Sequence, residues 1–146
     1  MTLLYKHLED KNFWYKKYLA CTEAFLVALR HAPEIALDEL ELFYGNRESL
    51  LKILDSLDEK IQAFVTEAER KGTEFNTAQS TKVQYYLREK DPIVARIVDL
   101  DRELMNSLDE LRAKGEEKLK LLAKGKKALA KYKSSGQGNE KIDKRV

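Results

Sequence analysis

Hydrophobic residues recur every three or four positions along most of the chain, which is the spacing of one face of a helix. The first such set consists of Leu4, Leu8, Tyr15, Tyr18, Phe25 and Leu29. It predicts a helix that begins before Phe13 and ends at about His31, where Pro33 interrupts the pattern. The apolar face is widened by three further residues, Trp14, Cys21 and Ala28. We therefore expect this helix to contact two others.

A heptad repeat predicts a second helix from about Glu34 to Arg70. One position of the repeat holds Leu40, Arg47, Leu54, Ile61 and Ala68, and the position three residues later holds Phe43, Leu50, Leu57 and Phe64. This is the a/d seam of a coiled coil. Gly45 disfavours a helix by about 1 kcal/mol relative to alanine, but the heptad phase is the same on both sides of Gly45 and Asn46. We therefore expect one continuous helix.

Residues 71–80 contain Gly, Thr, Asn and Ser, and we expect them to connect the second helix to a short third helix over Thr81–Lys90. Asp91 and Pro92 then resemble a helix start, with Asp as the N-cap and Pro at the first helical position. The last helix is expected to run from there to Tyr132. Its apolar stripe consists of Ile93, Ile97, Leu100, Leu104, Leu108, Leu111, Leu119, Leu122, Leu129 and Tyr132.

These segments predict an all-α fold, an elongated antiparallel bundle of three or four helices with coiled-coil-like packing. The sequence has no sustained alternation of apolar and polar residues, and no Asn-Gly or Asp-Gly pair separates two apolar runs. A chain of 146 residues suits one domain, so we expect a single helical domain over residues 1–133. Residues 134–146 lose the periodicity and gain Ser, Gly and charge, which predicts a disordered basic tail.

The sequence offers little for catalysis or metal binding. Cys21, His7 and His31 do not make a zinc ligand set, and neither histidine has the Glu three residues earlier that a helical diiron site requires. We therefore predict no enzyme, no metal and no cofactor. The N-terminal segment carries charges where a signal peptide needs an apolar core, and no segment resembles a membrane span. These features predict a cytoplasmic protein.

The formal net charge of +2 conceals a strong asymmetry along the chain. Residues 1–111 carry 15 basic and 21 acidic side chains, whereas residues 112–133 carry 9 and 2. Such a basic segment could neutralise nucleic-acid phosphates. However, it holds one arginine, one aromatic residue and no known docking motif, and the acidic remainder of the chain would repel a polyanion. We therefore predict no nucleic-acid partner.

Arg47 stands in the heptad seam, where the other four residues of its position are Leu, Ile or Ala. One interpretation is that its aliphatic stem lies along the seam while the guanidinium reaches water. The other is a half-buried ion pair with an acid of the last helix. Asp101 is the first candidate, because it interrupts the inner side of that helix, and Glu116 and Glu117 are rivals. The sequence leaves this choice open.

The stretch LLAKGKKALAKYKSS, residues 121–135, predicts an amphipathic basic helix. The expected lengths are about forty residues for the last helix, roughly thirty-five for the second and about twenty for the first. Part of the longest helix should therefore extend past its neighbours, and its apolar side would need a partner. The predicted partner-binding residues are Leu111, Leu119, Leu122, Leu129 and Tyr132. Four lysines are predicted to steer an acidic partner: Lys124, Lys126, Lys127 and Lys131.

Three stretches of the chain resemble the flagellar export chaperones of the FliT and FlgN type. They are LDELELFYGNRESLLKILDSLDEKI in the second helix, with an arginine before paired leucines, IVDLDRELMNSLDEL in the last helix, and the closing KGKKALAKY. The likeness covers residues 34–133, and the aromatic-rich N-terminal helix matches less well.

The resemblance implies a small cytosolic bacterial protein that binds the helical end of a late flagellar subunit. That subunit would be the filament cap or a hook–filament junction protein, which the chaperone delivers to the export apparatus. The resemblance also implies that Tyr132 docks to the export gate. The alternative function is a coiled-coil adaptor or a homo-oligomeric structural protein, in which copies of the chain cover the apolar stripe. A weak homodimer stays open.

Overall fold

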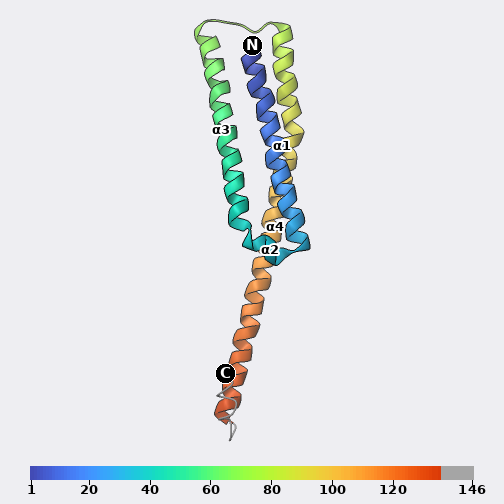
Figure 1. The fold of residues 1–146 in the computed structure, drawn as a ribbon, viewed down its shortest axis with the longest axis vertical. Coiled ribbons are helices and arrows are strands. Elements are labelled where there is room, and N and C mark those ends of the chain that lie inside the picture. Colours follow the sequence, from blue (N-terminus) through green and yellow to red (C-terminus); the bar gives the residue numbers. More distant parts are fainter. Residues whose placement is uncertain (136–146) are drawn as a thin grey trace. The chain divides into compact units, whose positions relative to one another are not determined.

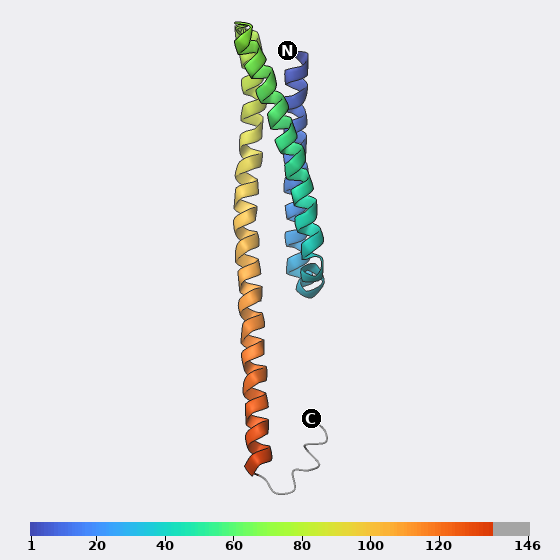
Figure 2. The same ribbon diagram turned by 90° about the vertical axis from the view of Figure 1, so that its left-hand side faces the viewer.

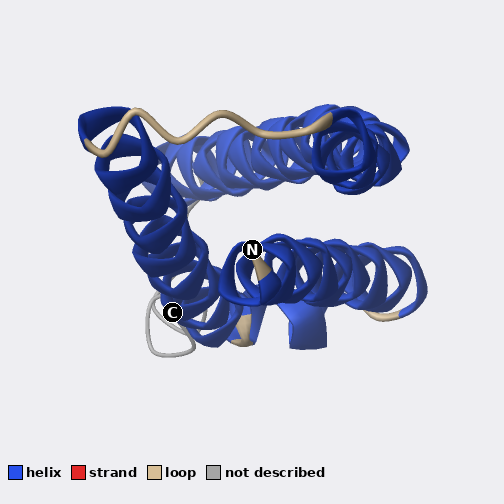
Figure 3. Cartoon of the chain, turned by 90° about the horizontal axis from the view of Figure 1, so that it is seen from above, coloured by secondary structure: helices blue, strands red, loops and turns tan. Residues whose placement is uncertain are grey.

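The computed structural model describes the backbone of residues 1–135 and the side chains of residues 1–127. In that part of the chain it contains four helices and no strand (Figure 3), so the predicted all-α class is confirmed. The helices are α1 (Thr2–His31), α2 (Pro33–Asp38), α3 (Leu40–Arg70) and α4 (Thr77–Ser135). The chain divides into two compact units, Met1–Leu104 and Met105–Val146, and α4 belongs to both.

The first unit is a bundle of α1, α3 and the N-terminal part of α4 (Figure 1). In this unit α1 and α4 run in one direction and α3 in the opposite direction, while α2 connects α1 to α3. Figure 2 shows α3 returning alongside α1. Each long helix contributes to the core, with Leu26 of α1, Leu54 of α3 and Leu104 of α4 at most 4% exposed. The predicted helical bundle is confirmed for this unit.

Helix α1 buries the face that its spacing predicted and contacts both other long helices. On one side, the ring of Phe25 stacks on Phe43 of α3 with centroids 4.0 Å apart. On the other side, Nδ2 of the buried Asn12 donates a hydrogen bond of 3.0 Å to the carbonyl oxygen of Tyr86 in α4. The expectation that this helix contacts two others is confirmed.

The heptad seam predicted for the second helix is the inner face of α3 along its whole length. Every predicted seam residue is buried or half-buried, whereas most residues between them are exposed. The helix also continues through Gly45 as expected. Gly45 lies on the exposed side of α3, so its missing side chain leaves no gap in the core.

The predicted start of the second helix at Glu34 is wrong, because the chain bends at Glu39. Residues 33–38 form the separate helix α2, which ends where the N–H of Glu39 donates to the carbonyl of Ala36 at 3.1 Å. These residues hold no seam position, because the seam begins at Leu40. Instead, α2 packs through Ala36, which is 2% exposed. This contact forms at the turn that lets α3 return alongside α1.

Helix α4 begins at Thr77, four residues before the predicted start at Thr81. The reason is a capping box, in which two side chains satisfy backbone N–H groups at the first turn. Oδ1 of Asn76 accepts the N–H of Gln79 at 2.8 Å, and Oε1 of Gln79 accepts the N–H of Asn76 at 3.0 Å. Both residues lie in the segment 71–80 that was predicted to be a connection, so this Asn-x-x-Gln pattern was the missed signal for the helix start.

Asp91 and Pro92 do not start a helix, because α4 continues through them. A proline in a helix leaves the carbonyl four residues earlier without its usual donor. Pro92 and Arg88 are both exposed, so the freed carbonyl of Arg88 lies on the water-facing side of α4. The apolar spacing also runs without a shift from Val83 to Ile97. The prediction of a separate short helix before Asp91 is therefore wrong.

The second unit begins at Met105 and contains α4 to its end at Ser135. Residues 136–146, most of the predicted tail 134–146, lie outside the described residues. Because the two units share one helix, the single domain expected over 1–133 stays a prediction. Among the residues that the structure describes, no helical stretch combines the length and the low charge of a membrane span.

Candidate functional site

The second unit presents a basic helix with exposed leucines, which we call the terminal basic segment and define as residues 112–127 of α4. It carries seven basic and two acidic side chains, and every side chain in it is exposed. Leu119, Leu121 and Leu122 are 66%, 60% and 63% exposed. Three large apolar side chains within four residues are thus exposed on a basic helix, and Leu119 and Leu122 share one side of it, a combination typical of a protein-binding site.

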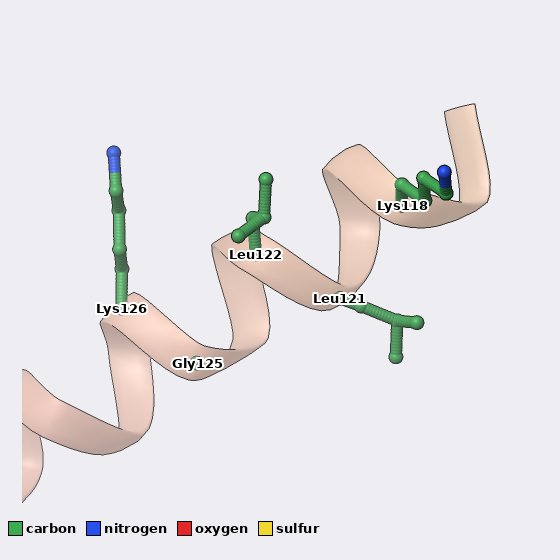
Figure 4. Close-up of a pocket in the computed structure, with 5 residues that line it drawn as sticks. All are labelled: Lys118, Leu121, Leu122, Gly125 and Lys126. Atoms are coloured by element: carbon green, nitrogen blue, oxygen red, sulfur yellow. The ribbon is translucent and has the colours of Figure 1, made fainter. Parts of the chain in front are cut away.

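Leu121 and Leu122 lie on either side of Gly125, which follows them by four and three residues (Figure 4). The side chain of Leu121 points to one side of the helix, and those of Leu122 and Lys126 point to the other. Because glycine has no side chain, the surface between the leucines is a shallow depression, which Lys118 also lines. Leu121 was not among the predicted partner-binding residues, because it lies outside the apolar stripe. Its spacing from Gly125 was the signal that could have identified it.

The predicted partner-binding residues differ in their surroundings. Leu111 is half-buried, whereas Leu119 and Leu122 are exposed. Leu129 and Tyr132 belong to α4, but their side chains lie outside the described residues. The structure therefore brings Leu119 and Leu122 onto adjacent turns of one surface.

The predicted steering lysines are exposed as far as they are described. These are Lys124, Lys126 and Lys127, while the side chain of Lys131 lies outside the described residues. Between residues 112 and 127 the structure contains one ion pair, with Nε of Arg112 3.4 Å from Oε1 of Glu116. Most of the positive charge of the terminal basic segment therefore has no acidic partner within that segment.

In the first unit, Arg47 occupies its seam position with the guanidinium directed into the bundle. Nη2 lies 2.9 Å from Oδ1 of Asp101 in α4, and Nε donates a hydrogen bond of 2.8 Å to the hydroxyl of Tyr18 in α1. The guanidinium also lies 4.6 Å from the ring centroid of Tyr18 and 5.3 Å from that of Phe43. Arg47 thus links three helices, and the interpretation that places its guanidinium in water is wrong.

This ion pair is partly shielded from water, since the side chains of Arg47 and Asp101 are 15% and 38% exposed. Oδ1 of Asp101 is inaccessible to solvent and makes no hydrogen bond of good geometry, so the charge of Arg47 is its main compensation.

The guanidinium of Arg47 also acts on Cys21. Burial raises the pKa of the Cys21 thiol, and the positive charge of Arg47 partly lowers that pKa again. A thiol with a raised pKa is a weak nucleophile at neutral pH. Cys21 is thus no candidate nucleophile, and the contacts of Arg47 with Asp101 and Tyr18 hold three helices together.

None of the known protein families, curated proteins and solved structures that were compared with this chain matches it.

Proposed function

We propose that this chain is a cytoplasmic export chaperone of the flagellar type III system. It binds the helical end of a late flagellar subunit, the filament cap or a hook–filament junction protein, and delivers that subunit to the export apparatus. The observation that carries the proposal is the exposure of Leu119, Leu121 and Leu122 on a basic helix. The resemblance of residues 34–133 to the FliT and FlgN type supports a flagellar subunit as the partner.

The exposed leucines support binding by helix-on-helix packing. Full burial of one leucine side chain stabilises a complex by about 1.5–3 kcal/mol, and roughly two thirds of each leucine is available. Leu119 and Leu122, which share one side of α4, together offer about 2–4 kcal/mol, whereas association costs an estimated ~4–15 kcal/mol. The subunit helix must therefore extend over further turns of α4. Leu129 and Tyr132 continue the same apolar stripe and are proposed to supply that contact.

The lysines support an acidic partner. Unpaired positive charge at the surface raises the rate of encounter with an acidic helix. The effect falls with added salt, because the Debye length at physiological ionic strength is about 8 Å. We therefore assign Lys124, Lys126 and Lys127 to steering and the leucines to affinity. Docking of Tyr132 to the export gate is proposed from the family resemblance.

Calorimetric titration of the full chain with peptides tests the proposal. The peptides correspond to the helical ends of a filament cap protein and of a hook–filament junction protein. The double variant Leu119→Ala/Leu122→Ala should bind the cognate peptide at least ~10-fold more weakly. Leu42→Ala is the matched control, because Leu42 of α3 is 65% exposed and lies in the other unit.

Equal affinities of the chain and the double variant would remove the terminal basic segment from the binding site. Failure of both peptides to bind would overturn the chaperone proposal. The solution mass then distinguishes the alternative: a stable oligomer that protects residues 119–127 from amide exchange supports a homo-oligomeric structural protein.

A further inference from the structure

Helix α1 has a second apolar face, which the first unit leaves exposed. It consists of Phe13, Ala20, Ala24 and Val27, and Phe13 and Val27 are 49% and 51% exposed. Intervals of seven, four and three residues place these side chains along one side of the helix. The exposed Lys17 lies on the same side between Phe13 and Ala20, with its Nζ 5.3 Å from the centroid of the Phe13 ring. The core residues of α1, such as Leu8 and Tyr18, lie on the opposite side. We call the four apolar residues the outer seam of α1.

A row of charges with alternating sign runs beside the outer seam. The row consists of Glu9, Lys16, Glu23 and Arg30, all of them exposed. Their spacing of seven residues places them on one flank of the outer seam. Their order along the helix is acidic, basic, acidic, basic. Reversing the direction of the helix turns this order into its opposite.

We propose that the outer seam joins two copies of this chain, with their α1 helices antiparallel about a two-fold axis beside Ala20. In an antiparallel pair related by such an axis, the same flank of both helices meets on one side of the interface. Glu9 then lies opposite Arg30 of the second copy, and Lys16 lies opposite Glu23 of the second copy. Symmetry repeats both contacts, so every charge in the row meets an opposite charge.

The apolar residues fit the same axis. Phe13 lies opposite Val27 of the second copy, and Ala20 lies opposite Ala20 at the axis. The small side chains of Ala20 and Ala24 leave room beside the axis for the aliphatic stem of Lys17, and Phe13 and Val27 pack at both ends. The outer seam and the charged row therefore predict the same register independently.

A parallel pair lacks this complementarity. Parallel α1 helices would place Phe13 against Phe13 of the second copy. The charged row of one helix would then face the other flank of the outer seam in the second helix. That flank holds His7, Trp14, Cys21 and Ala28, which offer no alternating charges. The charge pattern therefore selects the antiparallel arrangement.

Two charges of the row also have contacts within the chain. Nζ of Lys16 lies 3.9 Å from Oε1 of Glu89, and Nη2 of Arg30 lies 2.9 Å from Oε2 of Glu103. Both basic side chains are 61% exposed, so each keeps room for a second acid. Exposed ion pairs add little affinity but fix orientation. The dimer is therefore weak, and its affinity depends on Phe13 and Val27.

This inference does not rest on the proposed function, because the outer seam belongs to the first unit and the terminal basic segment to the second. A dimer through α1 and a chaperone without a dimer are separate outcomes. Measurements on the full chain without any subunit peptide test the dimer alone.

Sedimentation equilibrium over a range of concentrations gives the first test. The chain should show a reversible monomer–dimer equilibrium, and Ala20→Glu should weaken it at least ~10-fold. Ala63→Glu is the matched control, because Ala63 is also an exposed helical alanine, on α3, and it should leave the equilibrium unchanged. Unchanged circular dichroism shows that both variants fold. A monomer at concentrations up to about 1 mM would overturn the proposal.

Exchange of charges tests the register. Lys16→Glu places two acids opposite each other at each contact, and Glu23→Lys places two bases there, so each variant should dimerise less. The double variant Lys16→Glu/Glu23→Lys restores opposite charges and should recover the dimer. No recovery in the double variant contradicts the antiparallel register.

Cross-linking decides the direction. In a Cys21→Ser background, Phe13→Cys and Val27→Cys should each fail to form disulfide dimers alone and should cross-link to each other when mixed. Ala20→Cys should cross-link to itself. Efficient self-cross-linking of Phe13→Cys and of Val27→Cys would demonstrate a parallel pair and overturn the proposal.

Discussion

Nη2 of Arg47 lies 2.9 Å from Oδ1 of Asp101, and this contact joins α3 to α4 across the first unit. The side chains of Arg47 and Asp101 are 15% and 38% exposed, which makes this the most shielded ion pair among the described side chains. Removing one member of a shielded pair leaves the other charge poorly solvated. The pair therefore offers a direct test of the packing of the bundle.

Arg47→Leu should lower the free energy of unfolding by about 1–2 kcal/mol, less than the cost for a fully buried pair because Asp101 retains some access to water. Urea unfolding followed by circular dichroism measures the change. Arg47→Leu/Asp101→Leu should regain most of the loss, because neither charge then remains. Arg30→Leu is the control, since Arg30 pairs with Glu103 at the surface, and it should change stability by about 0.5 kcal/mol or less. Full stability of Arg47→Leu would show that no obligatory pair exists.

Pro92→Ala should raise the free energy of unfolding by about 1–3 kcal/mol, because alanine restores a helical hydrogen bond in the interior of α4. Thermal unfolding measures this gain. Pro33→Ala should not stabilise the protein, since Pro33 lies in the first turn of α2, where a proline is favourable. If Pro92→Ala gave no gain, contacts of the proline ring would have to offset the missing hydrogen bond.

Asn76→Ala should cost about 1 kcal/mol, because it removes the side-chain acceptor for the N–H of Gln79 at the start of α4. Amide exchange at residues 77–80 should accelerate at the same time. Asn46→Ala is a suitable comparison, because Asn46 is an exposed residue inside α3 and its replacement should be neutral or stabilising. Equal exchange rates before and after Asn76→Ala would show that the capping box contributes nothing.

The pKa of the Cys21 thiol is raised by burial, and the charge of Arg47 partly offsets this. Alkylation of Cys21 should therefore reach its half-maximal rate at a higher pH in the folded protein than in urea. Arg47→Leu should raise that pH further. An exposed thiol, made by Ala63→Cys in a Cys21→Ser background, should react with the same pH dependence in both states.

The raised pKa of Cys21 also has a consequence for stability. The thiol is protonated in both states below its ordinary pKa, so its contribution to stability is complete there. As the pH rises toward the folded-state pKa, the unfolded chain loses its proton first, and this contribution is lost. The pH dependence of urea unfolding should therefore become flatter in alkaline solution for Cys21→Ser. Identical slopes for the two proteins would contradict the raised pKa.

The sequence by itself determined the inner face of each long helix, although the buried Leu26 and Thr22 of α1 were not in the predicted set. The heptad spacing of Leu54 and Leu57 identified the inner face of α3, because side chains three and four residues apart share a face in any helix. The same periodicity carried the helix through Gly45. The apolar spacing from Val83 to Ile97 likewise indicates one helix through Pro92. The prediction was wrong there because it followed the local preference of proline for a helix start. The expected helix lengths also indicated that the end of the apolar stripe would lack neighbours in the chain, and Leu119 and Leu122 are exposed.

Only the tertiary structure decided how these faces meet. The partner of Arg47 depended on the axial register of α3 against α4, which brings Asp101 rather than Glu116 to the guanidinium. The bend at Glu39 depended on the return of α3 alongside α1. Periodicity shows which residues share a face of one helix, but it does not show what covers that face. Phe13 and Val27 could thus be identified as exposed only after the neighbours of α1 were in place.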